Sequence, residues 1–157
     1  MSEPLILASA SRVRAAMLQA AGVSVEVVPA RVDESELKIA LRGQGADPRD
    51  AAVALAELKA LQVSRSHPGR LVLGADQMLD CDGAWFDKPG SSGAARDHLL
   101  TLRGKKHRLT SAAVLARDGS RLWNHATAAP LTMRGFTEVF LDGYLPKAGA
   151  AVLVLKF

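Results

Sequence analysis

Apolar residues in this chain gather in short aliphatic runs and at helical spacing, with turn residues between them. Short runs bounded by Gly, Pro, Asp or Ser are typical of strands, and apolar positions three and four apart are typical of helices. The predicted strands cover 4–8, 23–28, 71–73, 84–86, 109–116, 121–131 and the apolar tail 150–157. The predicted helices cover 12–21, 37–41, 48–64 and 94–102, with a weaker pattern over 132–145.

The stretch 71–89 forms the centre of this pattern. An apolar run ends at Gly74, and Asp76 and Gln77 follow it. Asp82-Gly83 between two apolar segments predicts a hairpin, after which Lys88 follows the return strand. A carboxylate and an ammonium could then meet at one rim of a sheet, where α/β proteins commonly bind ligands. The alternative is an Asp that ends a strand in a turn and a Lys that faces water.

The first strand passes directly into a helix through small hydroxyl residues. Ser9 or Ser11 can cap that helix, whose free N–H groups and positive dipole end favour phosphate. Arg12 or Arg14 in the first turn would add charge. The alternative is a plain capped helix with solvated arginines. Its apolar face combines Val13, Ala16, Met17 and Ala20.

Two further helix starts carry charged residues of interest. Asp33 and Glu34 precede a helical pattern, where acids usually serve the helix dipole. Asp47 as N-cap and Pro48 as first helical residue predict the start of the longest helix. Lys59 on that helix would ordinarily be a solvated lysine.

Composition narrows the function classes. The 157 residues suit one domain, and the net charge of +4 favours an anionic ligand without indicating a nucleic-acid surface. A single cysteine, Cys81, excludes an internal disulfide and fits a reducing cytoplasm. No apolar stretch is long enough to span a membrane, and the N-terminus does not resemble a signal peptide. The four histidines are isolated from one another, which argues against a histidine metal site; they are His67, His98, His107 and His125.

Five segments, in this order, resemble the Maf family of nucleotide pyrophosphatases. The segments are Leu7-Ala8-Ser9-Ala10-Ser11 with Arg14, Val32-Asp33-Glu34, Leu55-Ala56-Glu57-Leu58-Lys59-Ala60, Gly74-Ala75-Asp76-Gln77 and Asp87-Lys88-Pro89. Leu102-Arg103-Gly104 with His107 and Thr110, and Lys147-Ala148-Gly149, add weaker support. Each piece is unspecific by itself, but the ordered set spans nearly the whole chain.

The resemblance implies an α/β fold, a mixed twisted sheet flanked by helices, with a cleft between two lobes. It implies hydrolysis of a nucleoside triphosphate to monophosphate and diphosphate with Mg²⁺ or Mn²⁺ in the cytoplasm, by a protein that is often a homodimer. Asp76 falls on the family's proposed general base, and Glu34, Lys59 and Lys88 fall on its charged catalytic positions. Asp76 and Glu34 can hold the metal. Ser9, Ser11 and Arg14 fall on the phosphate-binding loop.

Two positions bear on which nucleobase the substrate would carry. The family's Ser-x-Ser-Pro-Arg-Arg is Ser-Ala-Ser-Arg-Val-Arg here, with Val13 in place of the Arg that marks the pyrimidine branch. With Gln77 present, the chain is more similar to the 7-methyl-GTP branch. Val13 cannot hydrogen-bond a pyrimidine carbonyl, and it also lacks a ring that could stack on a cationic purine.

The sequence also departs from the family pattern at its C-terminal end. The family continues past Lys147-Ala148-Gly149 with a further segment that closes the cleft, whereas this sequence ends at Phe157, so we expect one Maf-like domain over 1–157 that lacks the segment. This leaves a second hypothesis, a nucleotide-binding regulatory module with impaired catalysis, which would bind a triphosphate without forming product. A third, a basic nucleic-acid-binding protein, would show binding that weakens steeply with salt.

Overall fold

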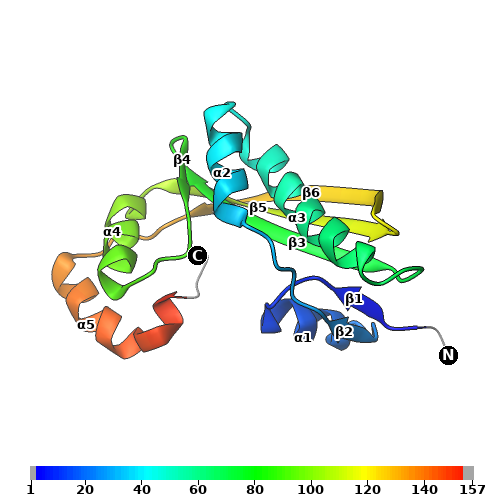
Figure 1. Ribbon diagram of the computed structural model, residues 1–157. Helices are drawn as coiled ribbons and strands as arrows, with labels where there is room; N and C mark the ends of the chain where they lie inside the picture. Colours follow the sequence, from blue (N-terminus) through cyan, green and yellow to red (C-terminus); the bar gives the residue numbers. More distant parts are fainter. Residues whose placement is uncertain (1–2, 154–157) are drawn as a thin grey trace. The chain divides into compact units, whose positions relative to one another are not determined.

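The computed structural model describes residues 3–153, in which strands and helices are interspersed along the chain (Figure 1). The strands are β1 (Leu5–Leu7), β2 (Val25–Val27), β3 (Val72–Cys81), β4 (Ala84–Phe86), β5 (Lys106–Arg117) and β6 (Ser120–Thr132). The helices are α1 (Arg12–Ala20), α2 (Glu34–Gly43), α3 (Pro48–Arg65), α4 (Ser92–Leu102) and α5 (Glu138–Ala148), followed by the 3₁₀-helix η1 (Gly149–Leu153).

The described strands form one mixed sheet in the order β2-β1-β3-β5-β6, with β4 on the side of β3. β1 runs parallel to both β2 and β3, whereas β3 and β4 are antiparallel. Leu7 lies opposite Leu73, so the residues that follow β1 run beside the middle of β3. This architecture confirms the predicted α/β fold with a mixed sheet flanked by helices.

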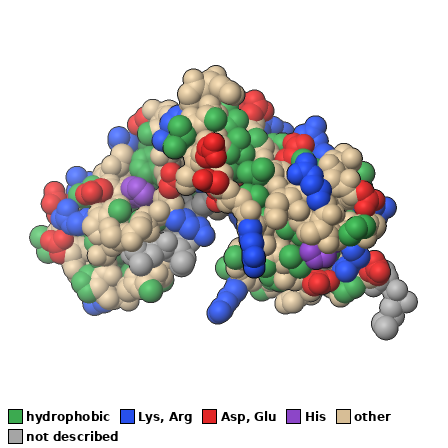
Figure 2. Space-filling model, viewed as in Figure 1, with side chains coloured by type: hydrophobic (Ala, Val, Ile, Leu, Met, Phe, Trp, Pro, Cys, Tyr) green, Lys and Arg blue, Asp and Glu red, His purple; other side chains and the backbone are tan. Residues whose placement is uncertain are grey.

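The chain divides into two compact units. The first contains residues 3–76 and Ser111–Thr127, and its core joins Ile6, Ala8, Val63 and Val72, all nearly inaccessible to solvent. The second contains Gln77–Thr110 and residues 128–153, with Leu79, Cys81 and Leu102 buried together. On the face of each unit shown in Figure 2, basic and acidic side chains are mixed and form no stripe of one sign.

Local capping chemistry explains where several elements begin and turn. The Asp47 carboxylate accepts hydrogen bonds from the backbone N–H groups of Arg49 (2.7 Å) and Asp50 (2.9 Å), and Pro48 opens α3 as predicted. Between β3 and β4, Asp82 and Gly83 have φ of 50° and 80°. Positive φ at both central residues is the geometry of a type I′ hairpin turn, which confirms the predicted hairpin.

Two sequence predictions of local structure are wrong. Asp76 does not end a strand: β3 continues through it to Cys81, and Asp76 is buried in mid-strand. The tail predicted as a strand forms η1 up to Leu153, and 154–157 lie outside the described residues.

The apolar face expected on α1 is exposed. Val13 and Met17 are 70% and 64% accessible, and no residue of α1 is buried. Periodicity alone therefore identified the helix but not a buried side for it. Across residues 3–153, no helix has both the length and the apolar character that crossing a membrane requires.

Candidate active site

Three predicted catalytic residues meet in the first unit. The Lys59 ammonium on α3 lies 2.8 Å from Asp76 Oδ1 on β3 and forms a second ion pair with Glu34 Oε1 at the start of α2. The side chains of Lys59 and Asp76 are 11% and 4% exposed, and that of Glu34 is 39% exposed. Lys59 is therefore not the solvated helix lysine that its position would ordinarily suggest, because it bridges two carboxylates at the edge of the core.

Close packing of α3 on β3 places Lys59. A Cβ atom at Gly74 would lie 2.1 Å from the Ala56 carbonyl oxygen and 2.8 Å from the Ala60 Cβ atom, so only glycine permits this approach. Ala56 and Ala60 are completely buried and lie one helical turn apart, facing the strand. Lys59 stands between them in sequence, and its long side chain reaches Asp76, two residues after Gly74.

A cap at the start of α2 places Glu34. The Asp33 side chain accepts a hydrogen bond from the Glu36 N–H at 3.0 Å, which fixes the helix start and makes Glu34 its first residue. The Gln62 Oε1 atom on α3 also accepts a hydrogen bond from the Arg31 N–H at 3.1 Å, which holds the segment that leads to the cap. Glu34 and Lys59 are thus anchored by contacts between the segment before α2 and α3.

Replacing Asp33 by Ala is expected to lower the free energy of unfolding by about 1 kcal/mol, the usual value of such a cap. Asp33→Asn keeps an acceptor for the Glu36 N–H and is expected to lose only a few tenths of that value. Urea unfolding of both variants measures the difference. Equal stability of the Ala and Asn variants would contradict the role of the Asp33 side chain as a cap.

The predicted phosphate loop forms a connected network between β1, α1 and β3. Arg14 donates from Nη1 to Ser9 Oγ (3.0 Å) and to the carbonyl oxygen of Ala75 (3.1 Å). Ser9 Oγ also accepts from the Ser11 N–H at 3.2 Å, and Ser11 caps α1 by accepting from the Arg14 N–H at 3.3 Å. Because Ala75 precedes Asp76, Arg14 connects the loop to the strand that carries the buried carboxylate.

This network leaves α1 suited to an anion. The first turn of α1 contains no acidic residue but contains Arg12 and Arg14. Cations are unfavourable beside the positive end of a helix dipole, so an anion placed here would offset the charge of both the arginines and the dipole. The structure thus brings together Ser9, Ser11 and Arg14 in one loop, and Glu34, Lys59 and Asp76 in one ion-paired cluster.

The remaining predicted site residues are placed as follows. Val13 lies exposed in the first turn of α1. Gln77 follows Asp76 on β3, is half-buried, and belongs to the second unit. Lys88 also belongs to the second unit, where it is exposed after β4. The roles of these three residues stay predictions.

The carboxylates meet part of what a divalent metal requires. Asp76 Oδ2 is buried and has no hydrogen-bond partner among residues 3–153, so a cation or a water molecule would satisfy an acceptor that is otherwise unpaired. Within the part of the chain that the structure describes, no three His, Cys, Asp or Glu side chains gather closely enough to hold a metal ion. This fits Mg²⁺, which is usually held by one or two carboxylates together with water and substrate phosphates.

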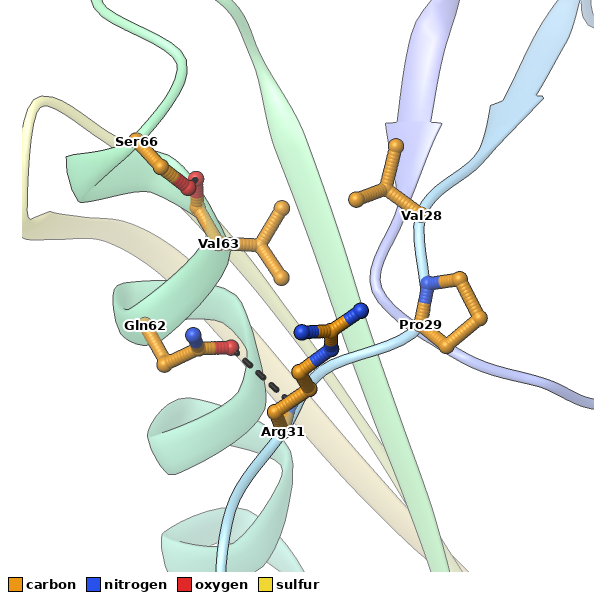
Figure 3. A pocket seen from close by; sticks show the side chains of 6 residues that line it. All are labelled: Val28, Pro29, Arg31, Gln62, Val63 and Ser66. Carbon is orange, nitrogen blue, oxygen red and sulfur yellow. Dashed lines mark hydrogen bonds between the residues drawn. The ribbon is translucent and has the colours of Figure 1, made fainter.

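A pocket of about 330 Å³ lies beside α3 in the first unit (Figure 3). None of the predicted site residues lines it; its walls are Val28, Pro29, Arg31, Gln62, Val63 and Ser66. Its one drawn hydrogen bond is the contact of Gln62 with the Arg31 backbone that supports the start of α2. The pocket therefore borders the segment that leads to α2, and Glu34 is not among its lining residues.

Sequence reasoning missed a second buried aspartate on β3. Asp80 in the second unit is 4% exposed, and its Oδ2 atom accepts from Arg108 Nη2 at 2.9 Å, while Oδ1 is buried without a partner. The signal available in the sequence was alternation, because Asp76 and Asp80 are an even number of residues apart on the same strand. Because the strand was predicted to end before Asp76, this alternation was not recognised.

Cys81 lies at the end of β3 as a buried free cysteine. Its thiol donates to the carbonyl oxygen of Lys106 at 3.4 Å. Burial, and next the negative charge of Asp82, raises the pKa of the Cys81 thiol, which disfavours the reactive thiolate.

Comparisons with known proteins identify relatives along nearly the whole chain. The family model described as "Maf-like protein" matches residues 4–152. A "Nucleoside triphosphate pyrophosphatase" of Paramagnetospirillum magneticum is 56% identical over 147 residues, which cover 94% of this chain and 76% of the relative. A "7-methyl-GTP pyrophosphatase" of Mesorhizobium japonicum is 49% identical over 153 residues, covering 98% and 77%.

A solved structure agrees at the level of the fold. The crystal structure of a nucleoside-triphosphatase (dITP/XTP pyrophosphatase) from Mycobacterium abscessus superposes with a TM-score of 0.50. It covers 83% of this chain and 72% of its own, at 19% sequence identity. The family match over residues 4–152, together with relatives of this identity, shows that the chain belongs to the Maf family.

Proposed function

We propose that the protein hydrolyses the α–β phosphoanhydride of a nucleoside triphosphate, giving the nucleoside monophosphate and diphosphate. The observation that carries this proposal is the bridge from Lys59 to Glu34 and to the buried Asp76, whose Oδ2 atom is left free. Family membership supports the same proposal, because this chain belongs to the Maf family and two of its relatives are named nucleoside triphosphate pyrophosphatases.

The loop after β1 binds the phosphates in this proposal. Ser11 and the first turn of α1 present N–H groups, and Arg12 adds a positive charge. Arg14 is already held by Ser9 and Ala75, so it contributes charge from a fixed position. A preorganised cation stabilises developing negative charge without reorganising during the reaction, which suits a triphosphate.

Asp76 supplies the base. A water molecule hydrogen-bonded to Asp76 Oδ2, a buried oxygen without a partner among the described residues, is oriented by it and gives up its proton to it. The water oxygen forms a bond to the α-phosphorus as the bond to the bridging oxygen breaks, and that oxygen leaves with the diphosphate. Lys59 and Lys88 stabilise the charge that gathers on the departing group.

A divalent cation is the second source of positive charge. Asp76 and Glu34 are the carboxylates that would hold Mg²⁺ or Mn²⁺ together with phosphate oxygens, and the bound cation would neutralise charge on the diphosphate. The donor set is all oxygen, as these hard cations prefer.

We further propose non-standard or surplus nucleotides as substrates, with 7-methyl-GTP the first to test. Val13 offers no hydrogen bond to a pyrimidine, Gln77 follows the catalytic aspartate, and one relative that is 49% identical is named a 7-methyl-GTP pyrophosphatase. A cytoplasmic setting, in keeping with one buried free cysteine, completes the proposal, and the homodimer stays a prediction.

A nucleotide panel tests the proposal. The purified chain is incubated with the common ribo- and deoxyribonucleoside triphosphates and with 7-methyl-GTP, in the presence of Mg²⁺ or Mn²⁺, and the products are resolved. The expected products are monophosphate and diphosphate in equal amounts. Calorimetric binding of a triphosphate without product would favour the regulatory-module alternative, and orthophosphate as the first product would contradict cleavage at the α–β bond.

A further inference from the structure

We propose that Lys59 takes the place of a resident metal ion in the free protein, so that a divalent cation enters only together with a triphosphate. The ligand of this site is then the metal–triphosphate complex rather than the bare cation. The inference rests on the proposed function and adds to it the form in which the substrate binds and the order in which the metal arrives.

The contacts of Lys59 are those of a bridging cation. Its ammonium lies 2.8 Å from Asp76 Oδ1 and pairs with Glu34 Oε1, so a single positive charge is shared by two carboxylates from different elements. Two acidic oxygens converging on one point are also what Mg²⁺ and Mn²⁺ bind. Because Lys59 is 11% exposed and anchored on α3, its ammonium stays beside the carboxylates where a cation would otherwise compete for them.

The free oxygens are too few for a bare metal. Lys59 engages one oxygen of Asp76 and one of Glu34, which leaves Asp76 Oδ2 as the buried acceptor without a partner. Mg²⁺ requires about six oxygen ligands in near-octahedral geometry. No third acidic, histidine or cysteine ligand joins the pair among residues 3–153.

A triphosphate changes this balance in two ways. Its oxygens add ligands for the metal, and its negative charge gives the Lys59 ammonium a new partner. The Lys59 ammonium can then pair with a phosphate oxygen in place of the carboxylates. Asp76 Oδ1 and Glu34 Oε1 thereby become available as metal ligands. Metal and nucleotide therefore assist each other's binding, and the buried Asp76 carboxylate keeps a counter-ion at every stage.

Removing the ammonium should convert the pair into a resident metal site. In Lys59→Met the two carboxylates lose their cation, and a divalent metal becomes the available counter-ion. Mn²⁺ binding to the protein without nucleotide is measured by the loss of the free-ion signal in electron paramagnetic resonance. We expect Lys59→Met to bind Mn²⁺ about tenfold tighter than wild type, because removing a positive charge from beside the two carboxylates strengthens their attraction for another cation.

Matched variants test whether the gain in Mn²⁺ affinity depends on Asp76. Asp76 and Asp80 are both 4% exposed on β3, each has one cationic partner, and each has one oxygen without a partner. Lys59→Met/Asp76→Asn is expected to lose the gain, and Lys59→Met/Asp80→Asn to keep it. Lys105→Met, which removes a half-exposed lysine paired with Asp82, should leave Mn²⁺ binding as in wild type. If Lys59→Met does not fold, Lys59→Gln is the replacement, since its neutral amide keeps a donor near Asp76.

The role of the triphosphate is tested separately with wild type. In ultrafiltration, free Mn²⁺ and its complex with an α,β-methylene triphosphate pass the membrane, whereas protein-bound Mn²⁺ is retained. Wild type is expected to retain Mn²⁺ only when the analogue is present. Equal retention with and without the analogue, or Mn²⁺ affinity of wild type equal to that of both Lys59 variants, would overturn the inference.

The outcomes also separate this inference from the proposed function. Hydrolysis of a nucleotide by wild type, with no gain of Mn²⁺ binding in Lys59→Met or Lys59→Gln, would overturn the inference alone. A gain in those variants that depends on Asp76, in a protein that hydrolyses no nucleotide of the panel, would support the cation role of Lys59 and overturn the proposed function.

Discussion

Asp76→Asn is expected to lower the rate of diphosphate release by about a thousandfold, within the range that a general base contributes. The substitution keeps the size of the side chain and its place in β3 but replaces the carboxylate that carries the free Oδ2 atom. An amide group cannot accept the proton of the attacking water. Lys59 keeps its ion pair with Glu34, so the loss of activity should not come from unfolding of the site.

The matched comparison is Asp80→Asn, which removes the other buried carboxylate of the same strand. We expect this variant to keep most of the activity, while both variants lose a similar amount of stability in urea unfolding. Single-turnover measurement with excess enzyme follows the chemical step directly. A comparable loss of rate in the two variants would show that a buried acid on β3 supports the fold and that Asp76 has no special part in the reaction.

Elements fixed by local chemistry could be predicted from the sequence. The start of α3 follows from Asp47 and Pro48, and the hairpin between β3 and β4 follows from Asp82 and Gly83, which adopt positive φ. Each of these signals acts within four residues, so no knowledge of the tertiary structure was needed. The α/β class and the mixed sheet were also predicted, on the basis of the resemblance to Maf proteins.

Features set by distant contacts could not be predicted in this way. β3 continues past Gly74 because its backbone pairs with neighbouring strands, and no residue between 74 and 81 signals that continuation. The exposure of the apolar side of α1 could not be predicted either. Helical periodicity shows which residues share a face, but it does not show whether another element covers that face.

The candidate site combines features that the sequence predicts with features that depend on distant contacts. The identities of Glu34, Lys59 and Asp76 came from the ordered motifs, because each residue is unremarkable by itself. Their meeting depends on how closely α3 approaches β3, which Gly74, Ala56 and Ala60 determine. A glycine before an acid was visible in the sequence, but its partners on α3 were not. The packing at Gly74 is therefore the tertiary contact on which the charged cluster depends.

Gly74→Ala is expected to destabilise the protein by about 3 kcal/mol or more and to abolish activity even where the variant folds. The added methyl group would lie 2.1 Å from the Ala56 carbonyl oxygen, which belongs to helix backbone and cannot rotate away. To relieve the overlap, α3 must move away from β3 and take Lys59 with it. A displacement of about 1 Å is enough to cost a hundredfold in rate when a catalytic group is misplaced.

Gly43→Ala is the control, because Gly43 ends α2 in the same unit and no atom lies within 4 Å of the added Cβ. Alanine there is expected to leave stability unchanged or to raise it by up to about 1 kcal/mol, since it restricts the unfolded chain. The midpoint of urea unfolding and the rate of diphosphate release are measured for both variants. If Gly74→Ala matches wild type in both, α3 does not press on β3 at this point, and the ion pair of Lys59 with Asp76 must be maintained by another contact.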